Sequence, residues 1–392
     1  MQQMRILGIE SSCDETSAAV IEDGKRLISV VTATSLDLHA KYGGVIPEIA
    51  ARSHIESIMP VIEQALAEAA KVTADNSTKK DDNVWDNIDA IAVTYGAGLG
   101  GCLLVGVMTA RTLAITKNKP LYAINHVEAH AYVNFLTEAT PDLQHSYNLP
   151  NQAPVFPALA LIVSGGHSQL VLFNDHFDYV LLGQTVDDAI GEAFDKVAKV
   201  LGLPYPGGPS ISKIAKKGKP HAYDFPKANL NTSNPKLESL RHAITSSNSH
   251  KNINYDFSFS GPKTAVLRTV QKMCGKDHSF PSFKLAELLN DTQKADVAAS
   301  FQRIAIETVV DKTVLAYQEF KPKTVIIGGG VASSPELRRQ LSEKLPIPIQ
   351  YTDPKLCTDN GAMVATLGYF KHIRKQPSSD PYSLDIQPNL SM

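Results

Sequence analysis

The sequence predicts an α/β protein built from two lobes, the second of which repeats the pattern of the first. The chain has 392 residues, which suits two hydrophobic cores better than one, because domains cluster near ~100–200 residues. Each half opens with two apolar segments joined by a polar or glycine-rich turn, as in a β-hairpin. Each half then alternates short apolar segments with amphipathic ones, the pattern of a sheet covered by helices.

In the first lobe, residues 1–150, apolar segments at Arg5–Ile9 and Ser17–Ile21 predict a hairpin around the turn Glu10–Thr16. Apolar residues at helical spacing over Glu48–Ala70 predict an amphipathic helix. The remaining expected elements are an exposed polar loop at Thr73–Trp85, a strand at Asp89–Val93, a glycine-rich turn leading into a helix at Cys102–Thr116, a strand at Leu121–Ile124 and a helix from His126.

The segment Thr137–Pro154 is rich in Pro, Asn and Gln, which marks the boundary between the lobes. The second lobe is expected over residues 151–374, and the non-periodic tail 375–392 is predicted to be disordered. Two similar lobes leave a cleft in which a ligand can bind. The expected elements of the second lobe are strands at 158–163, 169–173 and 324–327, helices at 186–201, 296–320, 335–345 and 361–369, and a long polar excursion at 216–255.

The composition is that of an ordinary globular protein. The formal net charge is −2, so binding to nucleic acid would need a local basic patch or a partner. The four cysteines are far apart and form no CxxC pair, which favours a reducing compartment. We see no basic leader and no stretch of ~20 apolar residues. The sequence therefore predicts a cytoplasmic protein without a signal peptide or a membrane contact.

Three glycine-rich turns in the second lobe suggest a nucleotide site. Ser164-Gly165-Gly166 lies between two apolar strands, where its backbone N–H groups suit a phosphate, although an ordinary hairpin turn fits as well. Gly328–Gly330 follows a buried strand and precedes a helix, and Tyr205–Pro209 is a third such turn. No GxGxxG or GxxxxGK[ST] motif is present.

His126 and His130 are four residues apart in HVEAH, so a helix would place both rings on one face, within reach of one metal ion. Histidines at this spacing also often face solvent. Asp359, at a loop-to-helix junction, is a suitable third ligand. A zinc protease would need HExxH or HxxEH, whereas Glu128 projects away from the two rings on a helix.

Two other sets of acidic residues allow two interpretations each. Asp14 and Glu15, in the first hairpin turn, are either candidate phosphate-proximal or catalytic residues or part of a solvated turn. Asp195, on an amphipathic helix, either binds ribose hydroxyls or pairs with Lys199.

Eight segments carry a resemblance to a known family, in order from about Arg5 to Tyr369. The chain resembles the tRNA N(6)-adenosine threonylcarbamoyltransferases of the bacterial type, formerly called O-sialoglycoprotein endopeptidases. The segments are LGIESSCDETSAAVI, YGGVIPEIAARSH, NHVEAHAY, LIVSGGHSQL, GEAFDKVAKVLGLPYPGGP, FSFSGPKTA, GGGVA and CTDNGAM.

The resemblance implies two duplicated lobes of the actin-like ATPase (ASKHA, ribonuclease-H-like) fold. It implies transfer of threonylcarbamoyl from threonylcarbamoyl-AMP to the exocyclic amine of the adenosine next to the anticodon, in tRNAs that read codons beginning with A. One divalent metal ion per subunit, iron(II) or alternatively zinc, would be held by His126, His130 and Asp359. The implied donor-binding residues are Ile162, Val163, Ser164, Gly165, Gly166, Asp195 and Gly208, with Ser334 in place of the family's usual asparagine.

The implied partners are tRNA, a shorter inactive paralogue, a small P-loop ATPase and a separate synthase that makes the donor. Two alternatives remain at this point. The chain could be a non-catalytic scaffold of the same complex, like the paralogue, but that paralogue lacks the metal ligands. It could also be another carbamoyltransferase or a small-molecule kinase, because fold does not determine function.

Overall fold

The computed structural model describes residues 3–74, 84–228, 230 and 254–392. These residues form two compact units, one made of residues 1–154 and 350–392 and the other of residues 155–349. Parts of the loop predicted at 73–85 and of the excursion predicted at 216–255 lie outside the described residues. No helix among the described residues has both the length and the hydrophobicity to cross a membrane.

The first unit contains a six-stranded sheet in the order β5-β4-β1-β2-β3-β6. Strands β1 to β3 form an antiparallel meander, and β4 and β5 extend it in parallel from β1. The strands are β1 (Arg5–Glu10), β2 (Glu15–Glu22), β3 (Arg26–Thr34), β4 (Ala90–Gly96), β5 (Leu121–Asn125) and β6 (Glu138–Ala139). The helices and 3₁₀ turns are α1 (Leu36–Ala40), α2 (Pro47–Ala74), η1 (Val84–Asn87), α3 (Gly100–Lys117), α4 (His126–Tyr132), η2 (Val133–Phe135), α5 (Pro141–Gln144), α12 (Pro354–Cys357) and α13 (Gly361–Ile373).

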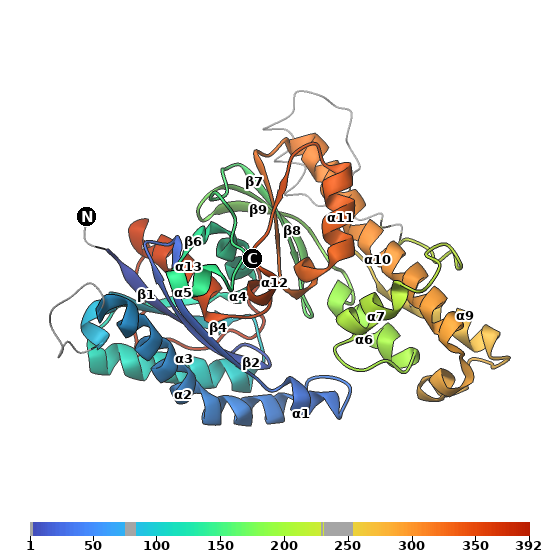
Figure 1. Cartoon of the computed structure of the whole chain (residues 1–392), viewed down its shortest axis with the longest axis horizontal. Helices are drawn as coiled ribbons and strands as arrows, with labels where there is room; N and C mark the ends of the chain where they lie inside the picture. The colour runs from blue at the N-terminus through green and yellow to red at the C-terminus, as the bar shows by residue number, and fades with distance from the viewer. Residues whose placement is uncertain (1–2, 75–83, 229, 231–253) are drawn as a thin grey trace. The chain divides into compact units, whose positions relative to one another are not determined.

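Both faces of this sheet are covered, which explains why β1 is buried at every position. Leu7 and Ile9 join the hydrophobic core beneath α2 and α3. The residues between them point to the other face of the sheet, toward α13. A Cβ on Gly8, for example, would lie 2.2 Å from the carbonyl oxygen of Gly361. Figure 1 shows α2 and α3 on one side of the sheet and α13 on the other.

The second unit repeats this strand order. Its sheet runs β11-β10-β7-β8-β9, again with an antiparallel meander and with β10 parallel to the first strand. The repeat confirms the predicted fold class of two duplicated α/β lobes. The strands are β7 (Ala158–Val163), β8 (Ser168–Asp175), β9 (Asp178–Gln184), β10 (Thr324–Gly328) and β11 (Ile349–Gln350). The helices and 3₁₀ turns are α6 (Ile190–Val200), α7 (Gly207–Ala215), α9 (Ser260–Met273), η4 (Ser282–Leu288), α10 (Asp291–Phe320), η5 (Gly330–Ser333) and α11 (Pro335–Lys344).

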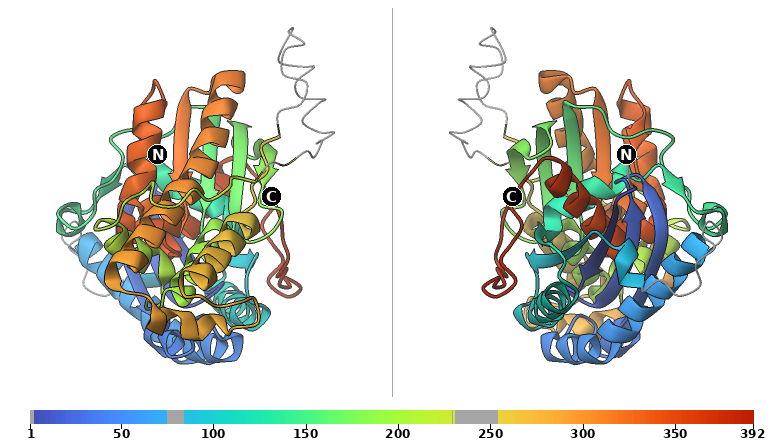
Figure 2. Two further views of the ribbon diagram at one scale, coloured as in Figure 1. Left: turned by 90° about the vertical axis from the view of Figure 1, so that its right-hand side faces the viewer. Right: turned by 90° about the vertical axis from the view of Figure 1, so that its left-hand side faces the viewer.

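The predicted division of the chain was wrong at its C-terminal end. Residues 350–374, assigned to the second lobe, belong to the first unit. The cause is packing, because α13 lies on β1, β2 and β4 of the first sheet, as the right-hand view of Figure 2 also shows. The glycine pair Gly8 and Gly361 allows this approach, since a Cβ at either position would collide with backbone.

The tail 375–392 was predicted to be disordered and is instead packed on the first unit. Ser379 pairs with Leu121 at the edge of β5. The guanidinium of Arg111, on α3, donates to the carbonyl oxygens of Pro381, Tyr382 and Leu384. Figure 2 shows the tail running close to α3. Leu384 and Ile386 also pack against the core. Two isolated apolar residues and main-chain hydrogen bonds leave no hydrophobic periodicity in the sequence, which is why the tail was predicted to be disordered.

Candidate metal centre and glycine-rich turns

The helix that carries the histidine pair begins directly at the end of β5. Asn125 caps α4, since its Oδ1 accepts hydrogen bonds from the backbone N–H groups of Val127 at 2.9 Å and Glu128 at 3.3 Å. The i, i+4 spacing then places the rings of His126 and His130 side by side, with centroids 4.8 Å apart. Both side chains are buried, so the pair does not face solvent.

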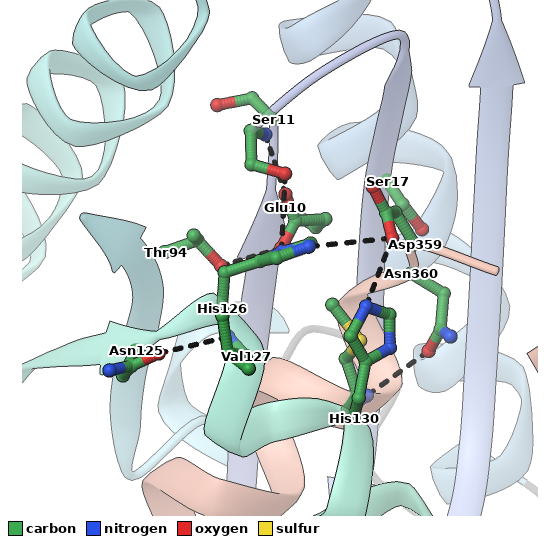
Figure 3. A network of polar contacts seen from close by, with 12 residues as sticks. Glu10, Ser11, Ser17, Thr94, Asn125, His126, Val127, His130, Asp359 and Asn360 are labelled. Atoms are coloured by element: carbon green, nitrogen blue, oxygen red, sulfur yellow. Dashed lines mark hydrogen bonds and ion pairs between the residues drawn. The ribbon is translucent and has the colours of Figure 1, made fainter. Parts of the chain in front are cut away.

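Asp359 reaches the histidines because the start of α13 is held against the sheet. Asn360 caps α13 by accepting from Met363 N at 3.1 Å, and Gly361 N donates to Ser17 Oγ on β2 at 3.0 Å. Asp359 Oδ1 consequently lies 3.6 Å from Nε2 of His126 and 3.4 Å from Nε2 of His130. Figure 3 shows the three side chains converging.

These three residues fit a divalent metal ion. Ligand atoms that each lie roughly 2.1 Å from one metal in tetrahedral geometry are roughly 3.4 Å apart, close to the two distances observed. Both ring nitrogens of His130 are buried and make no hydrogen bond within the described part of the chain, a costly arrangement that a metal at Nε2 would relieve. Two imidazoles and one carboxylate leave further coordination positions open for a substrate.

Electrostatics around the three ligands are governed by carboxylates. Burial acts to lower the pKa of His126, but the charges of Asp359 and Glu10 outweigh burial and raise the pKa to about 9. Burial raises the pKa of Glu15 to about 10, and the charges of Asp359 and Asp14 add to the effect. The charges of Asp359 and Glu10 thus favour a positive charge at His126, and they would favour a bound cation for the same reason.

The acidic turn lies beside the metal ligands. Ser35 fixes the turn, because its backbone N–H and its hydroxyl both donate to the carbonyl oxygen of Asp14, at 3.0 and 2.9 Å. The influence of Asp359 on Glu15 places that carboxyl near the centre. Glu15 is thus close enough to Asp359 to sense its charge, and Asp14 is its half-buried neighbour in the same turn.

Glu128 does not take part in the centre. Its carboxyl is buried on the side of Lys371, and burial raises its pKa to about 7 while Lys371 acts in the opposite direction. It lies outside the ligand group of His126, His130 and Asp359. A zinc-protease arrangement is absent from this helix, in agreement with the spacing argument.

One residue of the centre was missed from the sequence. Glu10, at the end of β1, lies with Oε2 3.3 Å from Nδ1 of His126. It is fully buried. The signal in the sequence is slight: a charged residue directly follows the apolar run Ile6–Ile9 at the end of the strand RILGIE.

In the second unit, the turn after β7 exposes its main chain. Ser164 closes the turn, with its N–H donating to His167 O at 2.8 Å and its Oγ accepting from His167 N at 3.1 Å. A Cβ on Gly165 or Gly166 would meet nothing within 4 Å. Ile162 and Val163, by contrast, are fully buried, main chain included, so the open part of this turn begins after them.

Two other glycines pack tightly around this turn. A Cβ on Gly191, at the start of α6, would lie 2.6 Å from Ser164 O. Gly329 has a φ of +86°, and a Cβ there would lie 2.3 Å from Val163 O. The structure therefore brings the first and second predicted turns together, with backbone against backbone.

The third turn is joined to the others through α6. Asp195 Oδ1, on α6, accepts from Gly207 N at 2.6 Å, and Gly208 at the start of α7 faces open space. Ser334 acts as the N-cap of α11, with its Oγ accepting from Leu337 N at 3.4 Å. Asp195 and Ser334 thus each have a structural role.

The chain is similar to a well-populated family. The sequence model described as TsaD, tRNA N6-adenosine threonylcarbamoyltransferase, matches residues 26–366. Proteins of that name from Thermomicrobium roseum and Desulfitobacterium hafniense are each 44% identical to this chain. The alignments cover 94% and 100% of this chain and 92% and 98% of the relatives.

Solved structures with a related fold are more distant. The activator of the 2-hydroxyisocaproyl-CoA dehydratase from Clostridium difficile is 14% identical with a TM-score of 0.44, covering 96% of this chain and 99% of its own. The ROK hexokinase from Thermus thermophilus is 16% identical with a TM-score of 0.37, covering 95% and 100%. The extent and identity of the sequence matches decide the family: the chain belongs to the tRNA N6-adenosine threonylcarbamoyltransferases.

Proposed function

We propose that the protein transfers the threonylcarbamoyl group from threonylcarbamoyl-AMP to the exocyclic amine of the adenosine next to the anticodon, in tRNAs that read codons beginning with A. Family membership supports transfer to tRNA. The observation that carries the proposal is the convergence of His126, His130 and Asp359, whose ligand atoms lie within 4.8 Å of one another. A non-catalytic scaffold would have no need of two buried histidines that converge on a carboxylate in this way.

We assign the metal as iron(II), with zinc as the alternative, because two imidazoles and one carboxylate suit either ion. A divalent ion bound there would polarise the donor carbonyl. His126, His130 and Asp359 would hold it with positions left open for the donor. Glu15 and Asp14, in the turn near Asp359, would lie close to the phosphate end of the donor.

The glycine-rich turns are proposed to bind the nucleotide part of the donor. The unobstructed N–H groups of Gly165 and Gly166 suit a phosphate and would stabilise charge developing on it as AMP leaves. Gly208 offers a second open stretch of main chain, held in place by the bond from Asp195 to Gly207. Because an adenine amine is a poor nucleophile, we expect positioning to supply much of the rate.

The proposed partners are tRNA, the shorter inactive paralogue, the small P-loop ATPase and the synthase that makes the donor, all in the cytoplasm and without a membrane. For the paralogue, neighbouring faces of α2 and α3 offer an apolar surface of exposed side chains. The two helices are in close contact, since a Cβ on Gly101 would lie 3.2 Å from Ala51 Cβ. Their exposed apolar side chains can therefore form one surface. The exposed residues are Ile55, Met59, Leu104 and Met108.

The test is transfer of label from carbon-14 threonine to unmodified tRNA, in the presence of ATP, bicarbonate, the synthase and the partner proteins. We expect label on tRNA with the wild type and none with the double variant His126→Ala/His130→Ala. The matched control is His145→Ala/His278→Ala, which removes two exposed histidines and should keep full activity.

Each alternative function has its own signature in this assay. No label with a folded, metal-loaded wild type and active partners would reject the transferase and favour another carbamoyl acceptor or a kinase. If the wild type and the His126→Ala/His130→Ala variant gave equal label, a partner would catalyse the reaction and this chain would be a scaffold.

A further inference from the structure

We propose that Glu10 is a positioning residue for the metal centre. Its carboxylate holds the imidazole of His126 in the orientation and tautomer in which Nε2 can bind a divalent metal. The inference rests on the metal site proposed above and adds a residue that is not among the three ligands.

The fold delivers Glu10 to this position through the two-residue period of β1. Ile6 and Gly8 face α13, because Cβ atoms on Gly368 and Gly8 would respectively meet the Ile6 side chain at 3.5 Å and the Gly361 carbonyl at 2.2 Å. Glu10 follows with the same parity, so its side chain enters the same layer, in which α13 begins two residues after Asp359. The carboxyl is 0% exposed, and a buried charge persists only where donors surround it.

The donors around Glu10 identify it as an ionised acceptor. Oε1 accepts from Ser12 N at 2.6 Å, and Oε2 accepts from Thr94 Oγ1 at 2.6 Å. Oε2 also lies 3.3 Å from His126 Nδ1. Since a carboxylate can only accept, Nδ1 must carry the hydrogen of this contact. Ser12 Oγ, 3.2 Å from the same nitrogen, can share that hydrogen.

The contact with Glu10 also determines the role of the other ring nitrogen of His126, Nε2. With the hydrogen held on Nδ1, Nε2 is the nitrogen that can give up its proton to a metal, and it lies 3.6 Å from Asp359 Oδ1. Figure 3 shows the His126 ring lying between Glu10 and Asp359. A carboxylate on the distal nitrogen is the usual device by which proteins orient a metal-binding histidine.

The second histidine lacks this device. Nδ1 of His130 is buried without a hydrogen bond to any residue that the structure describes. Its orientation comes from packing within α4, so the two histidines are held in different ways. Loss of Glu10 should therefore weaken the centre through His126 alone.

The experiment measures binding of cobalt(II) to metal-stripped protein, from its visible absorption and by competition with a chelator. We expect the isosteric Glu10→Gln to bind roughly 10–100-fold more weakly than the wild type, and Glu10→Asp, which keeps the charge, to recover part of the affinity. The matched control is Glu22→Gln, which removes another buried carboxylate of the same sheet, bound to Arg5. It should leave cobalt affinity unchanged.

A second measurement reads the tautomer directly. In zinc-loaded protein with ¹⁵N-labelled histidine, long-range ¹H–¹⁵N correlations should show His126 protonated at Nδ1. A proton on Nε2, or cobalt affinity of Glu10→Gln equal to that of the wild type, would overturn the proposal.

Misfolding of Glu10→Gln and absence of a metal site can each be distinguished from a failure of the positioning role. If Glu10→Gln does not fold, Thr94→Val decides, because it removes a donor that orients Glu10: weaker cobalt binding supports the positioning role and unchanged binding overturns it. If the wild type binds no cobalt, or binds it no more tightly than His126→Ala/His130→Ala, the proposed metal site is rejected and this inference is rejected with it.

Discussion

The two units build their candidate sites from different parts of the chain. In the first unit the functional groups are side chains, two buried histidines and the partly buried Asp359, which two capped helices bring together. In the second unit they are glycines of the main chain, Gly165, Gly166 and Gly208, where a Cβ would meet nothing within 4 Å. A site of side chains depends on residue identity, whereas a site of main chain depends on the absence of a side chain.

The largest expected effect is at the metal centre. Asp359→Asn keeps the size of the side chain but removes the negative ligand, so we expect metal affinity and transfer to tRNA to fall roughly 100-fold or more. Cobalt titration and the label assay measure the two losses. The control Asp142→Asn, on the exposed surface, should match the wild type, and full cobalt affinity of Asp359→Asn would remove this residue from the ligand set.

The next effect sharpens the contrast with the main-chain site. Gly165→Val places a branched side chain in open space, so the protein should keep its stability while transfer falls roughly 100-fold, the scale for loss of one charge-stabilising donor. Cobalt affinity should not change, because the metal ligands lie in the other unit. The control is Gly261→Val, at another open glycine. Equal activity of both variants would contradict phosphate binding at this turn.

A smaller effect distinguishes a glycine proposed to bind the phosphate, Gly165, from a glycine that allows close backbone packing, Gly329. Gly329→Ala combines a φ of +86° with a Cβ 2.3 Å from Val163 O, so we expect the free energy of unfolding to fall by about 1–3 kcal/mol. Gly165→Ala should leave it unchanged. Urea unfolding measures both. The distinction fails if the two alanine variants are equally stable.

The smallest effect depends on pH and concerns the entry to α6. Burial would raise the pKa of Asp188, but hydrogen bonds from Lys196 and Lys263 outweigh burial and lower it. Its stabilising contribution is therefore full above its unfolded pKa of about 3.9 and is lost as the pH falls through the lower folded value. Asp188→Asn should be less stable than the wild type at pH 7, and the difference should vanish on acidification below about pH 4. A constant difference across this range would rule out the ion pairs as the cause.

Sequence reasoning identified the strands that read as apolar runs, including β5 at one edge of the first sheet, and missed strands of mixed polarity. The predicted strand at 158–163 matches β7, which is buried throughout and reads as one apolar run. Strands β3 and β9 were not predicted, because each is only partly buried and mixes polar with apolar residues. Helix α7 was read as a turn, since it opens with Gly207-Gly208-Pro209.

The candidate site was predictable where chemistry depends on residue type and spacing. The histidines lie at i and i+4 within one short helix, and glycine runs mark the turns. Glu10 could not be found in this way, because its role arises from contacts with residues 84 and 116 positions away. Ser334 and Asp195 were predicted to bind a ligand, and only the structure shows the helix cap and the backbone bond that also occupy them.

By itself the sequence determined that the chain has two α/β lobes with repeated openings, and it supplied two histidines on one helical face together with the motifs of its family. These are local properties, governed by hydrophobic period, helix spacing and glycine. The tertiary structure decided which distant segments meet: that residues 350–392 join the first unit, that Asp359 reaches the histidines, and that Glu10 lies behind one of them. Such contacts follow from packing α13 against β1 through glycine on both sides, and packing between distant segments leaves no local pattern.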